Sequence, residues 1–557
     1  MANKDVLSNG IASPDSASTR GIHHGLDLSG LEGLSLYEKK CILVNREIER
    51  QGMGRYQWYI WTLCGFGYLI DLLWAQAFGL VLSPLQQELG FGNDESGNIS
   101  TSFNVGLTAG AFVWGFLGDI VSAGRRWAFN LTCLFSSVFG LCLGASNSYT
   151  TFLVPTAFVG FGVGGNIPLD TTITLEYIPQ NRRFLLACLS VFQPVGVIIC
   201  SAIALGFIPT YSCSPNFSES NPLPSCNNVR SGTPCCSREA NMGWRYLLFS
   251  IGGITLLIFI LRFFVFRFRE TPKFLLFRGQ DAQAINTLRH VAKVNKKECL
   301  LSLETFHLLE ESAPSSSRME ASPLFRRNLR HMRKTRKEGL AQELSRYKLL
   351  FDGFQMTRLT ILTWLTYIFD FSGFTVAGFY LPSILAYKNG LDNVSLQSTY
   401  TAYVYTYAPG IAGVLIGASL YRVPSIGRKW TMVLSSGLMG ASIFLFAIVD
   451  SRPRNEGLFS LEYIFQSMFN AVLYGWTPEA FPASIRASAC GFASFLGRLF
   501  GIVSPLIAQH LYGRTDGTDG HGDINGVLYL AGGVTLGCVV TVSLMPNRLM
   551  ESKDEQS

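Results

Sequence analysis

The chain has 557 residues, of which 48% are hydrophobic and only 15% are charged, and its formal net charge is +7. So small a polar fraction excludes an ordinary soluble protein of this length and favours a protein embedded in a lipid bilayer. The basic excess then needs no nucleic-acid partner, because basic residues are expected in the loops beside membrane spans.

Residues 1–57 form a polar tail without the basic start and apolar core of a cleavable signal peptide. Leu34 to Arg50 is predicted either as a short helix against the cytoplasmic face or as a solvated tail. A spanning helix needs about 20 apolar residues. The first six such runs lie near 58–83, 99–120, 128–146, 152–176, 184–209 and 244–266, and the second six near 359–386, 400–421, 430–449, 458–478, 487–511 and 525–545.

These twelve runs predict an all-α integral membrane fold of two six-helix bundles, at 58–266 and 358–545. A linker at 267–357 joins the bundles, and a short tail at 546–557 follows the second one. The linker is amphipathic through Leu309 and rich in Ser and Arg beyond it, which predicts a disordered or lipid-facing second part. An even number of spans places both termini on one side of the membrane.

Three polar patterns occur twice along the chain. Gly124-Arg125-Arg126-Trp127 returns as Gly427-Arg428-Lys429-Trp430, and Glu176-x-x-Pro179-x-x-x-Arg183 returns as Glu479-x-x-Pro482-x-x-x-Arg486, both 303 positions later (427 minus 124, and 479 minus 176). Tyr68-x-x-Asp71 returns as Tyr367-x-x-Asp370 after 299 positions. Three echoes in the same order indicate a duplicated six-span unit, the layout of a secondary transporter with its substrate path between two halves.

The loops predict which side of the membrane is the cytoplasm. The basic pairs of the repeated patterns and the linker occupy alternate loops, which assigns both termini to the cytoplasm. The opposite loops hold three glycosylation sequons, at Asn98, Asn216 and Asn393. They also hold the cysteine cluster Cys213, Cys226, Cys235 and Cys236, for which one or two disulfides of open connectivity are expected. A zinc site is the rival interpretation, which the absence of a neighbouring His disfavours; no metal or cofactor is expected.

The segment from Gly115 to Asp119, followed by Gly124-Arg125-Arg126, resembles the loop signature of the major facilitator superfamily. Glu270-Thr-Pro272 and the stretch Pro478 to Arg486 resemble elements of its sugar-porter relatives. Gly52 to Gln57 and Gly164 to Asp170 are similar to the synaptic-vesicle-protein-related branch, as found in fungi. The chain departs from the superfamily pattern because Gly124 follows Asp119 by five positions, Ile120 replaces a basic residue, and the second-half loop 417–429 has no acidic residue.

The resemblance implies that charged groups at the cytoplasmic helix ends hold the two bundles together in one state and release them in the other. It assigns this gate to Gly115, Asp119, Gly124, Arg125, Arg126, Glu176 and Arg183 in the first half and Gly427, Arg428, Lys429, Glu479 and Arg486 in the second. The alternative role of the arginines alone is to anchor the topology.

Asp71 is the first candidate for proton coupling. An ionisable group inside an apolar span costs roughly 2.5–3.5 kcal/mol on insertion scales and is usually retained for function. The alternative is a permanent pair between Asp71 and Arg498 that serves packing only. Asp370, at the equivalent repeat position, and Asp170, deep in the fourth span, are the other candidates.

Substrate contacts are expected from polar or aromatic residues inside the spans, although each aromatic alone is more often a packing residue. The candidates are Trp74, Gln76, Asn166, Gln193, Tyr367, Tyr380, Asn470, Tyr474, Trp476 and Arg498. Amides and hydroxyls suit a neutral, hydroxyl-rich solute, whereas Arg498 suits a carboxylate. The Gly-rich stretch from Gly160 to Gly165, with Pro168, predicts a close approach or a bend of helices.

The sequence therefore predicts a secondary active transporter of a small organic solute, with sugar-like compounds, organic acids and secondary metabolites as candidates. We expect alternating access, proton coupling, a monomer and a place in the plasma membrane, with import and export both open. No phosphate-binding Gly-x-x-x-x-Gly-Lys-Ser/Thr element occurs, and no enzyme activity is expected. The alternative is a non-transporting membrane receptor on the same fold, which would bind its ligand without net flux.

Overall fold

The computed structural model describes most of the chain between residues 36 and 546. The described ranges are 36–120, 125–213, 223–230, 232–265, 269–277, 279–312, 349–351, 353–391, 395–421, 423, 427–449, 451–481, 486–512 and 524–546. The chain divides into two compact units. The larger unit holds the predicted spans, and the smaller one holds the helix before the first span together with the start of the linker.

The first half of the larger unit contains six helical segments, two of which are broken into shorter helices. They are α2 (Arg55–Leu89), α3 (Gly97–Ile120), α4 (Arg125–Gly144), α5 (Tyr149–Val163) with α6 (Asn166–Tyr177), α7 (Phe184–Cys188) with α8 (Phe192–Phe207), and α9 (Gly243–Ile260). A 3-10 turn at Leu189–Val191 continues α7 into α8, and a π-helical turn at Leu261–Val265 extends α9.

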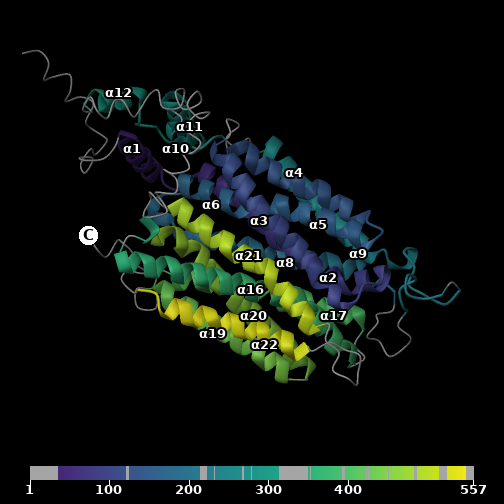
Figure 1. The fold of residues 1–557 in the computed structure, drawn as a ribbon. Helices are drawn as coiled ribbons and strands as arrows, with labels where there is room; N and C mark the ends of the chain where they lie inside the picture. The colour runs from purple at the N-terminus through teal and green to yellow at the C-terminus, as the bar shows by residue number, and fades with distance from the viewer. Residues whose placement is uncertain are drawn as a thin grey trace, which may run out of the picture. The chain divides into compact units, whose positions relative to one another are not determined.

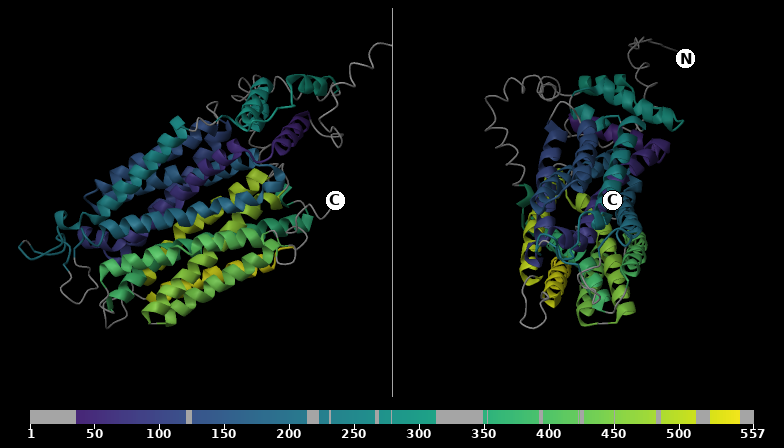
Figure 2. Two further views of the ribbon diagram at one scale, coloured as in Figure 1. Left: turned by 180° about the vertical axis from the view of Figure 1, so that it is seen from behind. Right: turned by 90° about the vertical axis from the view of Figure 1, so that its right-hand side faces the viewer.

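The second half also contains six helical segments, of which the second is broken into two helices. Its helices are α16 (Gly353–Leu391), α17 (Leu396–Tyr407) with α18 (Gly410–Leu420), α19 (Gly427–Ile448), α20 (Arg452–Ala480), α21 (Arg486–Tyr512) and α22 (Ile524–Ser543). The helices of the two halves run side by side, the first half in purple to teal and the second in green to yellow (Figures 1 and 2).

Nine helices within the described ranges combine at least 18 residues with a composition apolar enough to cross a membrane. The fourth predicted span is not among them because α5 ends at Val163, which leaves a shorter apolar helix. The second and the tenth are missing as well: α3 carries Asn98, Asn104 and several Ser and Thr residues, and α20 carries Arg452, Arg454, Glu456 and Glu462. Charged side chains at one end and in the middle of α20 explain why its composition alone does not mark it as a spanning helix.

Glycines bring α3 and α5 into direct backbone contact. A Cβ atom added to Gly106 would lie 1.9 Å from the carbonyl oxygen of Ala157, and one added to Gly160 would lie 2.2 Å from that of Phe103. A Cβ on Gly164 would likewise lie 2.2 Å from the carbonyl oxygen of Leu107. Only residues without a side chain allow helices to approach so closely. The close approach predicted for the stretch Gly160 to Gly165 is therefore confirmed.

The two halves contact each other along α21 and α3. The Thr101 hydroxyl donates to the carbonyl oxygen of Ile502 (3.3 Å), and a Cβ on Gly97 would lie 2.6 Å from the carbonyl oxygen of Pro505. Further along, the Tyr400 hydroxyl donates to the carbonyl oxygen of Leu80 (2.8 Å). These contacts join the ends of the halves that lie near the α2–α3 loop.

A second set of contacts joins the halves at their opposite ends. Gly475 of α20 faces α7, where a Cβ on the glycine would lie 3.0 Å from the Cβ of Ala187. The middle of the larger unit is therefore bounded by contacts between the halves on both sides.

The smaller unit is built from α1 (Leu36–Gln51), α10 (Pro272–Phe277), α11 (Asp281–Val294) and α12 (Leu303–Ser312). Apolar side chains from α1 and the linker share one core, which includes Leu43, Ile48, Leu288 and Phe306. Lys40 of α1 pairs with Asp281 (2.5 Å) and with Glu310 (2.6 Å). The helix predicted at 34–50 thus packs on the start of the linker.

Candidate substrate site

A cavity lies between the two halves of the larger unit. Its volume, measured over the positions open to the centre of a water-sized sphere, is about 90 Å³. One buried water needs only about 10–15 Å³ on that measure, so the cavity has room for a small organic molecule. Its polar lining consists of Asp71, Gln76, Ser100, Asn104, Gln193, Asp370, Thr375, Tyr407, Glu462, Tyr463, Gln466, Asn470, Tyr474 and Arg498.

One face of α20 supplies four of these groups. Glu462, Gln466, Asn470 and Tyr474 are spaced four residues apart, which places them on the same side of a helix, and all four line the cavity. Asn470 and Tyr474 are among the candidates predicted from the sequence, whereas Glu462 and Gln466 are not. The four-residue spacing of polar groups through an apolar run was the signal that could have found them.

Asp370 of α16 is a second carboxylate on the cavity wall. When the Asn470 amide is oriented with its nitrogen toward Asp370, this nitrogen donates to the two carboxylate oxygens at 3.1 and 3.2 Å. Asp370 is only 2% exposed, and no basic side chain in the described ranges forms an ion pair with it. An amide is therefore its main polar neighbour.

Arg498 of α21 reaches from the second half into the first. Its Nη1 atom donates to the carbonyl oxygens of Leu107 (3.0 Å) and Gly164 (3.1 Å). The close packing of α3 on α5 brings these two carbonyls together. Asp71 of α2 lines the same cavity and interacts electrostatically with Arg498, although the described residues show no ion pair between them within 4.0 Å.

An aromatic cluster borders the cavity beside Glu462. The ring of Tyr407 meets Phe459 edge to face at 5.2 Å and Tyr463 at 4.8 Å between centroids. The Gln76 amide donates to the Tyr407 hydroxyl at 2.9 Å, which fixes this ring across the two halves. None of the three aromatic residues was a sequence candidate, because nothing in the local pattern separates them from packing residues.

Asp170, the third proton-coupling candidate, does not line the cavity. It pairs with Arg262 (3.3 Å), and both side chains are fully buried. Arg262 also donates to the carbonyl oxygens of Leu63 and Phe129 and stacks on the Phe129 ring at 3.9 Å. Gly67 makes room for the pair, since a Cβ there would lie 1.6 Å from an Asp170 oxygen. The pair ties α2, α4, α6 and the end of α9 together.

Five of the ten predicted substrate residues line the cavity, namely Gln76, Gln193, Asn470, Tyr474 and Arg498. The other five are buried elsewhere: Trp74, Asn166, Tyr367, Tyr380 and Trp476. Trp74 donates to Thr255 (3.1 Å), and Tyr367 donates to Thr477 (3.1 Å). The rotation of each helix about its axis decides which of these candidates face the cavity. This rotation cannot be inferred from residue type.

Two of the predicted gate residues of the second half, Arg428 and Glu479, form a cluster with Tyr421. Arg428 pairs with Glu479 (2.7 Å) and stacks on the Tyr421 ring at 4.4 Å, and the Tyr421 hydroxyl donates to Glu479 (2.7 Å). Gly427 begins α19 with a φ of +54°, a left-handed conformation that favours glycine. Lys429 donates to the carbonyl oxygen of Met545 (2.9 Å).

Several predicted gate groups lie outside what the structure describes. They are Gly124 and the side chains of Gly115, Asp119, Arg125, Arg126 and Arg486. In the first half, Glu176 is half-buried near the end of α6, and Arg183 is half-buried just before α7. Arg183 interacts electrostatically with Tyr421 of the second half.

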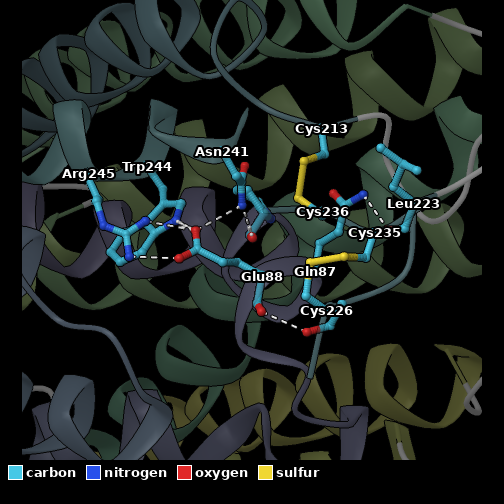
Figure 3. The surroundings of a disulfide bond; sticks show 12 residues. Gln87, Glu88, Cys213, Leu223, Cys226, Cys235, Cys236, Asn241, Trp244 and Arg245 are labelled. Atoms are coloured by element: carbon cyan, nitrogen blue, oxygen red, sulfur yellow. Dashed lines mark hydrogen bonds and ion pairs between the residues drawn. A yellow bond between two sulfur atoms is a disulfide. The ribbon is translucent and has the colours of Figure 1, made fainter. Parts of the chain in front are cut away.

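The loop between α8 and α9 is closed by two disulfides, Cys213–Cys236 and Cys226–Cys235 (Figure 3). It docks on the end of α2, where the Gln87 amide donates to the carbonyl oxygen of Leu223 and the Ser225 hydroxyl to that of Glu88.

Beside this loop, the Glu88 carboxylate accepts two hydrogen bonds from Arg245 (2.7 and 2.8 Å) and one from Trp244 (2.9 Å) (Figure 3). Among the sequons, Asn98 is half-buried in the first turn of α3, while Asn216 and Asn393 lie outside the described residues.

Comparison with known proteins identifies the family. Residues 84–547 match the model of the sugar (and other) transporter family. A curated relative from Ceriporiopsis subvermispora, named MFS siderochrome iron transporter 1, is 34% identical over 485 residues, which cover 85% of this chain and 86% of the relative. The major facilitator-type transporter hxnZ from Emericella nidulans is 32% identical, with coverage of 85% and 82%.

Solved structures show the same fold. The proton:xylose symporter XylE, bound to 6-bromo-6-deoxy-D-glucose, aligns with a TM-score of 0.61 and 16% identity, over 88% of this chain and 96% of that one. The predicted all-α membrane fold is confirmed, and so is the resemblance to fungal sugar-porter-like proteins. The chain belongs to the sugar (and other) transporter family of the major facilitator superfamily, and it is a multi-pass membrane protein and a secondary transporter of small solutes.

Proposed function

We propose that this transporter moves a small polar organic solute together with protons, and that the solute binds in the cavity between the two halves. One observation carries the proposal: among the described residues, three carboxylates, Asp71, Asp370 and Glu462, line a cavity together with one guanidinium group, that of Arg498. Carboxylates at this depth are costly unless they are neutralised, and protons or a solute can do so.

Asp71 and Arg498 form the coupling element of this proposal. Arg498 belongs to the second half but is bound to two carbonyls of the first, beside Asp71. While Asp71 is ionised, it stabilises the guanidinium in this position. A proton on Asp71 removes that attraction and leaves Arg498 free to follow its own half. Protonation therefore shifts the balance between two arrangements of the halves, as alternating access requires.

Asp370 can be stable in both protonation states because Asn470 is its neighbour. An amide donates from nitrogen and accepts through oxygen. It can therefore donate to the Asp370 carboxylate, and after turning over it can accept from the carboxylic acid. This property suits a residue that binds and releases a proton during each cycle.

The cluster of Arg428, Glu479 and Tyr421 would act as the gate of the second half. All three residues belong to that half, while Arg183 of the first half is an electrostatic neighbour of Tyr421. In this proposal, Arg183 leaves the cluster when the halves separate at this end. The cluster itself stays intact and keeps α19 and α20 together.

The orientation follows from the basic loops of the sequence. We place both termini and the gate cluster in the cytoplasm and the disulfide-closed loop outside, where thiols oxidise. The plasma membrane is the proposed location, and the monomer, which contains the whole cavity, is the proposed functional unit.

Solute flux into proteoliposomes under an imposed pH gradient tests the proposal. Sugars, organic acids, organic cations and neutral metabolites are offered to the unmodified chain and to the variants Asp71→Asn and Asp370→Asn. We expect gradient-driven accumulation of one class, and its loss with Asp71→Asn while exchange without a gradient persists. Accumulation that ignores the pH gradient in the unmodified chain would refute proton coupling. Binding without any flux would refute transport itself.

A further inference from the structure

We propose that the part of the cavity formed by Glu462, Tyr407, Phe459 and Tyr463 binds a positively charged nitrogen, so that the solute is an organic cation. The inference rests on the proposed function, because it assumes that the solute occupies this cavity. It adds the chemical class of the solute, which the family alone does not fix.

Glu462 differs from Glu88, the other deeply buried glutamate in the described parts of the membrane helices. Glu88, which is 8% exposed, receives two hydrogen bonds from Arg245 and one from Trp244. Glu462 is 4% exposed, and within the described ranges no side chain forms an ion pair or a hydrogen bond with it. The fold thus neutralises Glu88 internally but leaves Glu462 to be neutralised from the cavity, which it lines.

The charge balance of the cavity also favours a cation. Arg498 stands beside Asp71, so these two groups offset each other electrostatically. Asp370 has the Asn470 amide as its neighbour. Glu462 remains as the carboxylate with neither a basic nor an amide partner among the described side chains. A cationic solute would supply the missing positive charge, whereas an anionic one would add to the repulsion.

The rings beside Glu462 suit the same ligand. Tyr407, Phe459 and Tyr463 all line the cavity, and their mutual edge-to-face contacts hold them as a rigid group. The Gln76 amide further fixes Tyr407 through its hydroxyl. Aromatic faces attract cations, and quaternary ammonium groups are commonly recognised by several rings together with a carboxylate. A rigid set of rings loses little entropy when the ligand binds.

The competing role for Glu462 is that of a further proton carrier that stays neutral when the solute binds. In that case a neutral solute of the same shape should bind as well as a cation. The two roles are separated by comparing ligands that differ only in charge.

The experiment measures binding to the purified full-length transporter by calorimetry without a proton gradient. Two pairs of ligands of matched shape serve as probes: choline with 3,3-dimethylbutan-1-ol, and N-methylpyridinium with toluene. We expect each cation to bind more tightly than its neutral counterpart. Glu462→Gln should weaken cation binding on the order of 30-fold or more, since it removes one partner of a buried charge pair. It should leave the neutral ligands unchanged.

Two further variants guard against a folding artefact. Glu462→Asp keeps the charge and should keep the preference for cations. Glu456→Gln, six residues earlier on α20 (462 minus 456), removes a carboxylate that pairs with Arg452 and does not line the cavity, so cation binding should be unchanged. The unfolding temperature of each variant verifies that it is folded.

Cations that bind no more tightly than their neutral counterparts, including no binding of either, would overturn the inference. So would a Glu462→Gln variant that folds and binds cations as the unmodified chain does. Proton-driven flux of a neutral or anionic solute would persist in either case if the proposed function holds. Failure of that flux in proteoliposomes would instead count against the proposed function, so the two failures are distinguishable.

Discussion

Arg262 offers the sharpest test of how the first half is held together. Its guanidinium is fully buried, pairs with Asp170 at 3.3 Å, and donates to carbonyl oxygens on two other segments. Replacing it by Met removes the positive charge and leaves the buried carboxyl group of Asp170 without its partner. Breaking a buried pair in this way costs about 3–5 kcal/mol. We therefore expect Arg262→Met to lower the free energy of unfolding by about that amount.

The double variant Arg262→Met with Asp170→Leu removes both charges at once. Replacing a buried ion pair by apolar groups of similar size is often neutral or stabilising. Here the double variant still loses the hydrogen bonds from Arg262 to the carbonyls of Leu63 and Phe129, at about 1 kcal/mol or more. We expect it to be clearly more stable than the single variant and slightly less stable than the unmodified chain.

Unfolding in mixed micelles, followed by far-UV circular dichroism at increasing denaturing detergent, measures both variants. Flux in proteoliposomes reports function separately. Because Asp170 does not line the cavity, the double variant should retain proton-coupled flux. A single variant as stable as the double one would refute the reasoning, since Asp170 would then bear no cost when left alone. Loss of coupling in a stable double variant would instead return Asp170 to the proton path.

Three other predictions follow from the packing, the disulfides and the smaller unit. Gly160→Ala should destabilise the chain by roughly 1–3 kcal/mol, because the added methyl group would overpack against the Phe103 carbonyl. Gly253→Ala should be neutral or slightly stabilising, because Gly253 has open space around it. Thermal unfolding of the two variants tests this difference. Cys226→Ser should cost about 2–4 kcal/mol, and a reducing agent should lower the unfolding temperature of the unmodified chain but have a smaller effect on the variant. Burial opposes ionisation of Glu310, but the hydrogen bond and charge of Lys40 outweigh it and lower the pKa of Glu310. The pair therefore stabilises the smaller unit at pH values above the unfolded pKa of Glu310, and this stabilisation is lost as the pH falls through the folded pKa. The stabilisation should amount to less than about 1 kcal/mol, because the pair is partly exposed. Glu310→Gln should remove this contribution to the pH dependence of stability, which the rate of proteolysis within α1 measures.

The sequence could predict the features that depend on residue types within one segment of the chain. Asp71, Asp370 and Arg498 are recognisable because a charge in an apolar run is rare, and the structure places all three on one cavity. The glycines at the end of α5 were recognisable because they form a Gly-rich stretch, Gly160 to Gly165. Glu462 was equally visible as a charge in a span, but it lies close to the charged start of α20, where acidic residues are unremarkable.

Other features depend on contacts that no local pattern contains. Trp74 and Tyr367 have the right chemistry for a substrate site, but their helix faces turn them toward Thr255 and Thr477. Four cysteines allow three pairings, so spacing alone leaves the disulfides open. The packing of α1 on the linker joins segments more than 200 residues apart, as the pair of Lys40 with Asp281 shows.

The buried carboxylates described in the membrane helices of this transporter fall into two groups, those with an arginine partner in the same half and those that line the cavity without one. Glu88 and Asp170 are buried carboxylates with arginine partners in the same half, Arg245 and Arg262. Such pairs keep their partners whichever way the halves move, so they stabilise each state equally and cannot drive a transition. Among the described side chains, the carboxylates of the cavity have no arginine partner in their own half, so a proton, a solute or the other half is left to neutralise them. Only groups of this second kind can change their interaction energy during a cycle, and for that reason the coupling residues should be sought among them.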